Sequence, residues 1–560
     1  MILGLDVGGT QTDTVLIDKN GVFYESKTPT GDNLLETLAL ALDKTLTNID
    51  PTNIERMTFS TTMATNAIVQ GLLADTGMIV SAGPGMDPAL FSVGPSYHVV
   101  EGCLDHQGLE AMPVNKEAVL NASDLIRQDG IKLVGIVTKF SVRNPAHELL
   151  ISDWVKNSFS HIALGHQVSG ALNFPRRITT TYLNAALYGL HQEFTNAVIR
   201  TIGKKDLQAP RFLLKPDGGT VGLEQSLYYP AGTAQSGPAA SVMGALALDG
   251  CKGNSIVLDI GGTTTDMSVV LNGVPLLARH GIMLGPFQTL VRSLLTRSIG
   301  MGGDSEIQIE KNGNLKIGPL RKGSPVAFGG NIPTPTDAMI TLDLIRIGNG
   351  EAARDAMEKL AVPLGLTADK MAHEVLKHTA QSIAVSVNDF IGYINSRPLY
   401  TIHEVVQEKK IIPDSVVIIG GPAPQFADYV GKALGLPYRV PSHFGVANAV
   451  GAAVARVTSE ISLQADTQRG TVVIPEADVQ DKIASDFSLE DASSLAREVI
   501  KKQALQAGAD PSDLDITITE KEMFNMIRGY SRTGRNIRLK MSIVPGIIPE
   551  WNRRKQDDTR

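Results

Sequence analysis

Two aspartates that each follow a short apolar run are the residues of this chain best suited to chemistry. Residues 6–13 read DVGGTQTD, and residues 259–266 repeat the pattern as DIGGTTTD. In each copy an apolar strand runs into an aspartate, a Gly-Gly-Thr turn follows, and a second apolar strand begins. The repeated phrase therefore predicts two hairpins of the same design, one at the start and one near the middle of the chain.

The residue types in the two turns favour binding of a phosphate chain. Glycines let backbone N–H groups approach a bulky anion closely, and threonine hydroxyls add further donors. The aspartate that ends each first strand can hold a divalent cation, or its water, against phosphate oxygens. Two such hairpins facing each other would clamp a nucleotide polyphosphate.

A tight hairpin closed by Gly-Gly-Thr is the alternative for either copy alone, because such a turn needs no ligand. Two copies of the same pattern far apart in one chain are much harder to obtain from hairpin geometry. We therefore interpret the pair as the mark of two related lobes.

Length and composition limit the class of protein. A chain of 560 residues exceeds the size of a single core, so several domains are expected. The net charge is −7 and the basic residues are scattered, which argues against nucleic acid as a partner. The two cysteines, Cys103 and Cys251, lack CxxC spacing, so a disulfide framework and a cysteine zinc site are unsupported.

Targeting signals are missing from the sequence pattern. The chain enters its first strand at Ile2 without a basic segment followed by an apolar one. No run of about eighteen apolar residues occurs. We expect a cytoplasmic protein that is neither exported nor membrane-spanning.

The segments around the first hairpin alternate between strand and helix. Asp32–Leu46 carries leucines at helical spacing, and Phe59–Val69 is a hydroxyl-rich turn that opens a helix. Thr76–Ser81 reads as a strand, and residues 118–128, 133–137 and 147–156 continue as helix, strand and helix. This rhythm predicts an α/β domain.

The later segments predict a second lobe and a small module. A long helix is expected over Arg177–Arg200, and the strand Ser415–Ile419 ends in a diglycine turn. Beyond about residue 460 the chain has more charge and fewer glycines. We expect a first lobe over 1–175, a second over 176–460, an α+β module over 461–547 and a disordered tail over 548–560.

The order of these motifs resembles the superfamily of actin, sugar kinases and heat-shock ATPases, with two phosphate motifs and a late adenosine motif. Seven strings narrow the resemblance to the A-type subunits of the hydantoinase/oxoprolinase family, over roughly residues 1–457: DVGGTQTDTVLID, TTMATNAIVQG, FSVRNPAHE, RRITTTYLNAAL, PDGGTVG, SGPAASVMGAL and LDIGGTTTDMSVV. The resemblance implies two related actin-like (ribonuclease-H-like) lobes around a nucleotide cleft.

The resemblance also implies an activity. Such a subunit uses ATP and Mg²⁺ to phosphorylate the carbonyl oxygen of a lactam, hydantoin or oxoproline-like cyclic amide. A B-type subunit, usually a separate chain, then completes hydrolysis or carboxylation. Phosphorylation makes the amide carbon electrophilic, and the paired loops and Mg²⁺ would stabilise the charge on the transferring group.

Roles follow for the residues of the motifs. Asp6 and Asp259 are the predicted catalytic carboxylates and Mg²⁺ ligands, whereas Asp13 and Asp266 are expected to brace the hairpins. The predicted nucleotide contacts are Gly8, Gly9, Thr10, Thr12, Gly261, Gly262, Thr263, Thr264, Gly420 and Gly421. The last two would let adenine or ribose lie against the backbone.

Substrate contacts are predicted less directly. The candidates are Thr61, Thr62, His166, Arg176 and Arg177. A lone histidine such as His166 is more often structural, and the arginine pair either clamps an anion or precedes a helix in solvent.

The chain departs from its relatives at several motifs. Relatives tend to show His-Gly-Thr-Thr at Phe59–Thr62 and Ser-His-Glu at Gly165–Gln167. The glycine-rich loop keeps Gly300, Gly302 and Gly303 but lacks an Asp-Pro-Gly-Pro sequence, and the chain is shorter than those subunits usually are. A small-molecule kinase and a nucleotide-driven regulatory ATPase therefore remain as alternatives. The sequence leaves open the substrate, the need for a B-type partner, the role of the module and self-association.

Overall fold

The computed structural model divides the chain into two units. Unit 1 comprises Met1–Ala239, Ala278–Ser293 and Ala452–Arg560, and unit 2 comprises Ala240–Leu277 and Leu294–Gly451. The structure describes residues 1–18, 20–31, 33–47, 49–310, 314–319, 321–396, 410–549 and 551.

The first sheet of unit 1 is built around the N-terminal strand. Its six strands lie in the order β12-β11-β4-β1-β2-β3, with β1, β4 and β11 parallel and β1, β2 and β3 antiparallel. All six residues of β1 are buried, which matches its apolar run. The strands are β1 (Ile2–Val7), β2 (Gln11–Asp18), β3 (Gly21–Pro29), β4 (Arg56–Thr61), β11 (Arg211–Leu214) and β12 (Thr220–Gly222).

Helices cover this sheet because their apolar residues recur at helical spacing. Leu38 and Leu42 of α1 (Leu34–Thr45) and Phe194 and Val198 of α7 (Tyr188–Gly203) join the core that the sheet forms. Asn33 begins α1 by accepting hydrogen bonds from the backbone of the first turn. The short helix α2 (Met63–Val69) follows β4 directly.

A second sheet of unit 1 is parallel, in the order β10-β9-β5-β6. Separate apolar cores lie against it, one with α3 and α4 and one with α6. The elements of this part are β5 (Thr76–Ser81), β6 (Ser96–Val99), β7 (Cys103–Leu104), β8 (Glu110–Met112), α3 (Lys116–Gln128), β9 (Leu133–Thr138), α4 (Ala146–Val155), β10 (His161–Leu164), α5 (Gly165–Val168), α6 (Phe174–Ala186), β16 (Met283–Leu284) and β17 (Phe287–Gln288).

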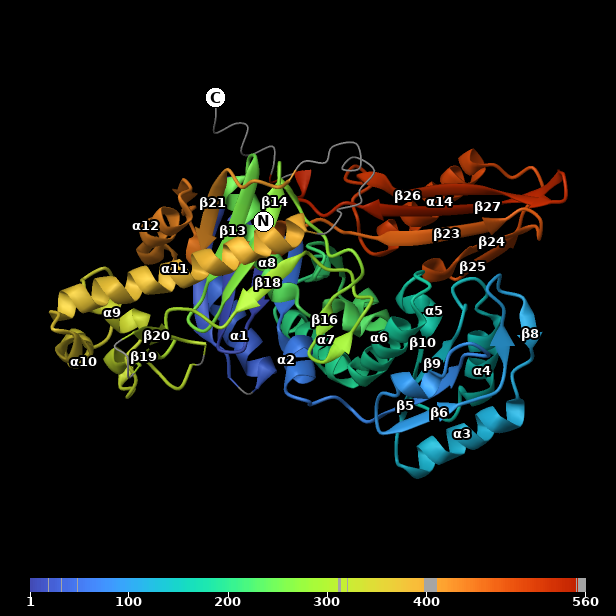
Figure 1. Ribbon diagram of the computed structural model, residues 1–560, viewed down its shortest axis with the longest axis horizontal. Helices are drawn as coiled ribbons and strands as arrows, with labels where there is room; N and C mark the ends of the chain where they lie inside the picture. Colours follow the sequence, from blue (N-terminus) through green and yellow to red (C-terminus); the bar gives the residue numbers. More distant parts are fainter. Residues whose placement is uncertain are drawn as a thin grey trace. The chain divides into compact units, whose positions relative to one another are not determined.

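The C-terminal part of unit 1, drawn in orange to red in Figure 1, is an antiparallel sheet in the order β25-β24-β23-β27-β26. Helix α14 (Leu489–Gln506) packs on it through Ala496 and Ile500. The strands are β23 (Glu460–Asp466), β24 (Thr471–Ile474), β25 (Val479–Lys482), β26 (Ile516–Arg528) and β27 (Ser531–Ile543).

The predicted tail lies mostly outside the described residues. Ile548 and Trp551, which are described, are buried, and the Ile548 N–H donates to Val454 O at 2.9 Å. These two residues pack on the protein and are not part of a solvated tail. The predicted domain boundaries stay a prediction.

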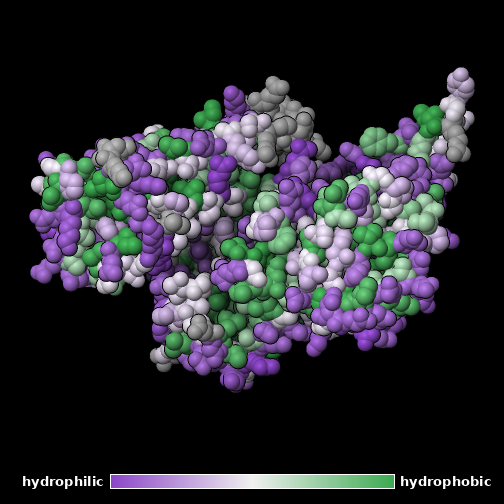
Figure 2. Space-filling view, turned by 60° about the horizontal axis from the view of Figure 1, so that its bottom comes forward, coloured by the Kyte–Doolittle hydropathy of each residue, from purple (hydrophilic) through white to green (hydrophobic). Residues whose placement is uncertain are grey.

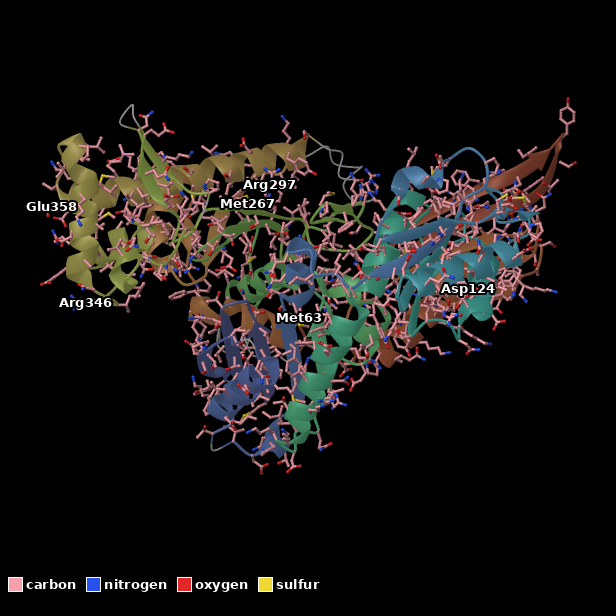
Figure 3. The ribbon with its side chains drawn as sticks, turned by 90° about the horizontal axis from the view of Figure 1, so that it is seen from below. Met63, Asp124, Met267, Arg297, Arg346 and Glu358 are labelled. Atoms are coloured by element: carbon pink, nitrogen blue, oxygen red, sulfur yellow. The ribbon has the colours of Figure 1, made fainter. Side chains whose placement is uncertain are left out.

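Unit 2 repeats the arrangement of the first sheet. Strand β13 is antiparallel to β14 and parallel to β21, as β1 is to β2 and β4, and β14 pairs further with β15 and β18. Figure 3 labels Met267 on β14 and Arg297 on β18, which are partners in this pairing. The strands are β13 (Asn254–Ile260), β14 (Thr265–Leu271), β15 (Val274–Pro275), β18 (Thr296–Ile299), β21 (Ser415–Ile419) and β22 (Tyr438–Arg439).

The helices of unit 2 pack on this sheet around one apolar core. Figure 1 shows α11 in yellow as a long helix, and its residues Met371, Ile383 and Phe390 belong to that core. The remaining elements of unit 2 are β19 (Ile307–Ile309), β20 (Leu315–Ile317), α9 (Pro335–Thr341), α10 (Gly350–Ala361), α11 (Ala368–Asn395) and α12 (Ala423–Leu434). Helices α8 (Ser236–Asp249) and α13 (Ala447–Val454) each have residues in both units. The predicted α/β class with two related lobes is confirmed.

The surface carries both kinds of residue. The face in Figure 2 shows hydrophobic residues interspersed among hydrophilic ones. Across the described residues, no helix combines the length and the apolar character needed to cross a membrane.

Candidate functional site

The first hairpin has the tight turn that its glycines predict. Asp6 lies opposite Asp13 in the β1–β2 pair, and the Gly8 N–H donates to Gln11 O at 3.0 Å. A Cβ on Gly8 would lie 2.8 Å from that same oxygen, so a side chain at this position would open the turn. Gly9 and Thr10 are exposed at the tip, whereas Asp6 is buried at its base.

A second turn lies beside this hairpin within unit 1. The hydroxyl of Thr62 accepts from Asn66 Nδ2 at 3.3 Å, and that nitrogen lies 3.6 Å from where a Cβ on Gly9 would be. Ser236 donates through its hydroxyl to Thr61 O at 2.9 Å. The structure thus brings the predicted residues Thr61 and Thr62 to the first Gly-Gly-Thr turn and adds Asn66 and Ser236.

The second hairpin has the same design. Asp259 lies opposite Asp266, and the Gly261 N–H donates to Thr264 O at 2.9 Å. Thr263 and Thr264 are exposed at the tip. Ser241 donates through its hydroxyl to Asp259 Oδ2 at 2.5 Å, which fixes the orientation of the carboxylate.

The diglycine turn after β21 lies against this aspartate. Gly420 has φ +97°, and a Cβ there would lie 2.2 Å from Ile260 O and 2.6 Å from Asp259 Oδ1. A Cβ on Gly421 would meet no heavy atom within 4 Å. Gly420 is therefore required by the close approach of the two segments, whereas Gly421 faces open space that a ligand can use.

The glycine-rich loop at residues 300–304 packs on the tip of the second hairpin. The Gly303 N–H donates to Gly261 O at 2.9 Å, and the Asp304 N–H donates to Gly262 O at 2.7 Å. A Cβ on Gly302 would lie 2.4 Å from Gly261 O. The glycines of this loop are explained by backbone packing, and they bring Asp304 to the turn.

Two carboxylates near the second hairpin have raised pKa values. Burial raises the pKa of Asp266 to about 6, with a smaller contribution from the charge of Asp259, while a hydrogen bond from Ser298 opposes the shift. Burial also raises the pKa of Asp304, and a hydrogen bond from Thr336 and the charge of Arg321 oppose it. By contrast, Asp13 of the first hairpin is paired with Lys27 at 3.0 Å.

His166 lies in a buried charged network. Its ring contacts Glu148 Oε2 at 2.6 Å through Nδ1 and Asp478 Oδ1 at 3.0 Å through Nε2. Burial lowers the pKa of His166, but the hydrogen bonds to Asp478 and Glu148 outweigh it and raise the pKa to about 9. The ring therefore connects the parallel sheet to the C-terminal part of unit 1, and its substrate role stays a prediction.

The neighbouring arginines are also engaged by the protein. Arg177 has no exposed surface and donates to Ser141 Oγ at 2.9 Å and Thr138 O at 3.0 Å. Arg176 donates to the carbonyls of His280 and Thr289, which belong to the segment that carries β16 and β17. Their contacts are structural, and a substrate role for either stays a prediction.

The two hairpins suit a nucleotide polyphosphate. Each has a glycine turn that leaves little room for a side chain, exposed threonine hydroxyls at the tip and an aspartate at the base. Mg²⁺ is often held by one or two carboxylates together with phosphate oxygens and water, which matches one aspartate per hairpin. In the described part of the chain, no group of three or more His, Cys, Asp or Glu residues is placed to hold a metal ion.

The hairpins belong to different units, the first to unit 1 and the second to unit 2. The structure brings Asp259, Gly261 and Gly420 together within unit 2, and Asp6, Gly9 and Thr62 within unit 1. The predicted cleft with both hairpins on one ligand stays a prediction.

Two regions of the chain match sequence models of one protein family. Residues 177–461 match the model described as hydantoinase/oxoprolinase. Residues 2–159 match the hydantoinase/oxoprolinase N-terminal region.

Curated relatives point the same way. The chain is 28% identical over 420 residues to the caprolactamase subunit alpha of Pseudomonas jessenii, covering 66% of this chain and 60% of that protein. It is 24% identical over 424 residues to the acetophenone carboxylase gamma subunit of Aromatoleum aromaticum, covering 65% of this chain and 57% of that protein. The matches span about three fifths of the length of both relatives.

A solved structure has the same fold. The crystal structure of the ATP-dependent caprolactamase from Pseudomonas jessenii matches with a TM-score of 0.71 at 19% identity, over 98% of this chain and 88% of that chain. At this identity the match establishes the fold alone.

Proposed function

The chain belongs to the hydantoinase/oxoprolinase family, as its motifs predict, and we propose that it is the ATP-dependent subunit of an enzyme that opens a cyclic amide. In this proposal the subunit phosphorylates the carbonyl oxygen of a lactam, hydantoin or oxoproline-like ring. The similarity to proteins named caprolactamase and 5-oxoprolinase supports this substrate class.

The observation that carries the proposal is the duplicated hairpin. The same pairing of aspartates, Asp6 with Asp13 and Asp259 with Asp266, sits at the base of a Gly-Gly-Thr tip in each unit. A tip of N–H groups and hydroxyls contributes hydrogen-bond donors at fixed positions, as stabilisation of a transferring phosphoryl group requires. In this proposal each tip contributes such donors to the phosphates of ATP.

The chemistry of activation follows from the amide itself. The ring nitrogen is a poor leaving group, and the carbonyl carbon is a weak electrophile. Attack of the carbonyl oxygen on the γ-phosphorus forms a C–O–P linkage and releases ADP. Water then adds to the carbon, the C–N bond breaks as the ring nitrogen leaves with a proton, and an acyl phosphate remains. A second water attacks the acyl carbon, its C–O bond to phosphate breaks, and the phosphate leaves with the former carbonyl oxygen.

Mg²⁺ and the nucleotide loops have proposed positions in this chemistry. Asp6 and Asp259 would hold the ion, which neutralises phosphate charge when bound. Gly421 faces open space at the turn next to Asp259 and would contact the adenosine. Thr61 and Thr62, beside the first tip, are the proposed substrate contacts best supported by their position.

A partner completes the proposal. The relatives carry the names of subunits, which supports a B-type chain that supplies the hydrolytic or carboxylating step. Cytoplasmic location and Mg²⁺ as the natural ion belong to the same proposal.

A small-molecule kinase is a second candidate, favoured by one observation. The family resemblance predicts histidine at the position of Phe59, whose side chain is fully buried in the core of the first sheet. A proton-transfer group is therefore replaced by a core residue at this position. In a kinase the phosphorylated product would be released without ring opening.

The test uses a lactam labelled with ¹⁸O in its carbonyl. The full chain is incubated with Mg-ATP and the labelled lactam, with and without a B-type subunit, and the phosphate and the organic product are analysed by mass spectrometry. Activation by phosphorylation predicts inorganic phosphate that carries the label. Unlabelled phosphate formed at the same rate without lactam would instead indicate a regulatory ATPase, and a stable phosphorylated product a kinase.

A further inference from the structure

An arginine that the sequence motifs do not include lies at the tip of the second hairpin. Arg321 Nη1 lies 3.4 Å from the hydroxyl of Thr263, and Nη2 lies 3.2 Å from Asp304 Oδ2. Nε donates to Gly323 O at 3.3 Å. The guanidinium therefore occupies a defined place next to a turn that we propose binds phosphate.

The loop that carries this arginine is anchored on both sides. The Gly318 N–H donates to Glu306 O at 2.9 Å, and a Cβ on Gly300 would lie 2.6 Å from Pro319 O. Lys322 is paired with Glu306 at 2.9 Å. Backbone packing of Gly318 and Pro319 holds the loop, and the half-exposed ion pair adds little to it, so Arg321 is positioned before any ligand arrives.

Asp304 orients the guanidinium and is itself fixed. Its backbone N–H donates to Gly262 O at 2.7 Å, and Thr336 donates to its Oδ1 at 3.0 Å. A Cβ on Gly262 would lie 2.8 Å from Asp304 Oδ2, so the carboxylate packs directly against the turn. A carboxylate there would repel phosphate unless a cation offsets its charge.

The remaining donors of Arg321 are suited to an anion. A guanidinium has five N–H donors in one plane, and three take part in the contacts described above. Among the described residues no partner is found for the other two donors, which are therefore available to a ligand. The Arg321 side chain is 37% exposed. Planar paired donors bind phosphate oxygens more selectively than a single ammonium group does.

We propose that Arg321 is a further polyphosphate contact of this chain, with Asp304 as the residue that positions it. The proposal rests on the proposed function, because it assumes that the second hairpin binds the phosphates of ATP. It assigns a residue outside the Gly-Gly-Thr motifs to binding, on a loop of irregular sequence.

The experiment measures binding by calorimetry with the full chain. Mg-ATP, adenosine and Mg-tripolyphosphate are titrated into the wild type, Arg321→Gln, Lys322→Gln and the double variant Asp304→Asn/Arg321→Gln. Lys322→Gln is the matched control, because it removes one positive charge from the same loop but leaves the Arg321 contacts with Thr263 and Asp304 intact. Unfolding temperatures of the free proteins report any structural loosening.

The expected result is specific to the phosphates. A charge-assisted hydrogen bond to phosphate predicts about tenfold or more weaker Mg-ATP binding in Arg321→Gln, with adenosine affinity within about twofold of wild type. Lys322→Gln should stay within about twofold for every ligand. The double variant Asp304→Asn/Arg321→Gln should bind Mg-ATP more tightly than Arg321→Gln alone, because it also lacks the Asp304 charge that Arg321 offsets.

Other outcomes separate this inference from the proposed function. If wild type binds Mg-ATP and Arg321→Gln binds it equally well, or loses adenosine to the same extent, the inference is overturned. If wild type binds Mg-tripolyphosphate in an Arg321-dependent manner but not Mg-ATP, the arginine contact stands and the proposed function falls. Absence of binding to every phosphate probe overturns both.

Discussion

Asp13 and Asp266 occupy matching positions after the turns of the two hairpins, but their surroundings differ. Asp13 pairs with Lys27 of the neighbouring strand, whereas Asp266 is flanked by β18 and lies near the charge of Asp259. Burial raises the pKa of Asp266 to about 6. The duplicated motif thus gives both hairpins the same backbone conformation. The neighbouring strand, β3 in one copy and β18 in the other, provides the side chains that surround each aspartate.

This difference predicts a pH-dependent stability change at one residue. The pKa of Asp266 is about 6 in the folded chain, above the value of about 3.9 in an unfolded chain, so its charged form opposes folding. The penalty is absent below about pH 4, grows between about pH 4 and 6 and is complete above that range. Asp266→Asn should therefore raise the unfolding temperature at pH 8, by an amount corresponding to about 2–3 kcal/mol, and leave it unchanged at pH 4.

Thermal unfolding of the nucleotide-free chain across this range checks the prediction. Asp355→Asn, an exposed aspartate on α10, serves as the control and should show no such pH dependence. A constant difference between Asp266→Asn and wild type from pH 4 to 8 would contradict it.

Residue types in a repeated motif can be predicted from sequence, but partners brought by distant loops cannot. Gly8 and Gly261 follow from the Gly-Gly-Thr phrase, since a tight turn needs glycine locally. Asp304 and Arg321 reach the second turn only through the packing of residues 300–304, 318–319 and 321–323. Their spacing along the chain carries no signal of this proximity.

At the scale of elements, the site is a set of turns at the ends of strands. Both hairpin tips follow a central buried strand, β1 or β13, and the diglycine turn follows β21 beside β13. Gly420 is enclosed at this turn and Gly421 is open. Gly420 therefore has a role in folding, whereas Gly421 is the proposed ligand contact.

The separation predicts opposite results for two similar substitutions. Gly420→Ala places a Cβ against Ile260 O and Asp259 at a positive φ, and should lower the unfolding temperature markedly, at a cost of about 1–3 kcal/mol or more. Gly421→Ala should leave the unfolding temperature unchanged and weaken adenosine binding several-fold. Calorimetry and thermal unfolding of both variants check this. Normal adenosine affinity in Gly421→Ala would refute the placement of adenosine at this turn.

Most elements follow from hydrophobic periodicity, and the exceptions have tertiary causes. The strand Thr76–Ser81 has the predicted bounds, and α3 and α4 lie close to theirs. The single helix predicted over Arg177–Arg200 is instead two helices, interrupted at Leu187. The physical reason is that α6 packs on the core of the parallel sheet and α7 on the core of the first sheet, so each part follows a different surface.

At the scale of the whole molecule, the two units repeat one plan and the chain adds a C-terminal sheet to unit 1. The repeat is visible in the sequence because the two tight turns use the same Gly-Gly-Thr residues in both units. The substrate was not, because the residues near the first tip, Thr61, Thr62 and Asn66, are common polar types without a ring-specific pattern. The partner subunit likewise belongs to the proposed function.

We propose that both hairpins bind one Mg-nucleotide, and calorimetry of Mg-ATP binding is the decisive test. The wild-type chain, Asp6→Asn, Asp259→Asn and the control Asp355→Asn are compared at the same Mg²⁺ concentration. We expect one nucleotide per chain in wild type and control, and affinity reduced by about tenfold or more in each of the other two variants. Mg-ATP binding that is absent in wild type, or unaffected by either substitution, would contradict it.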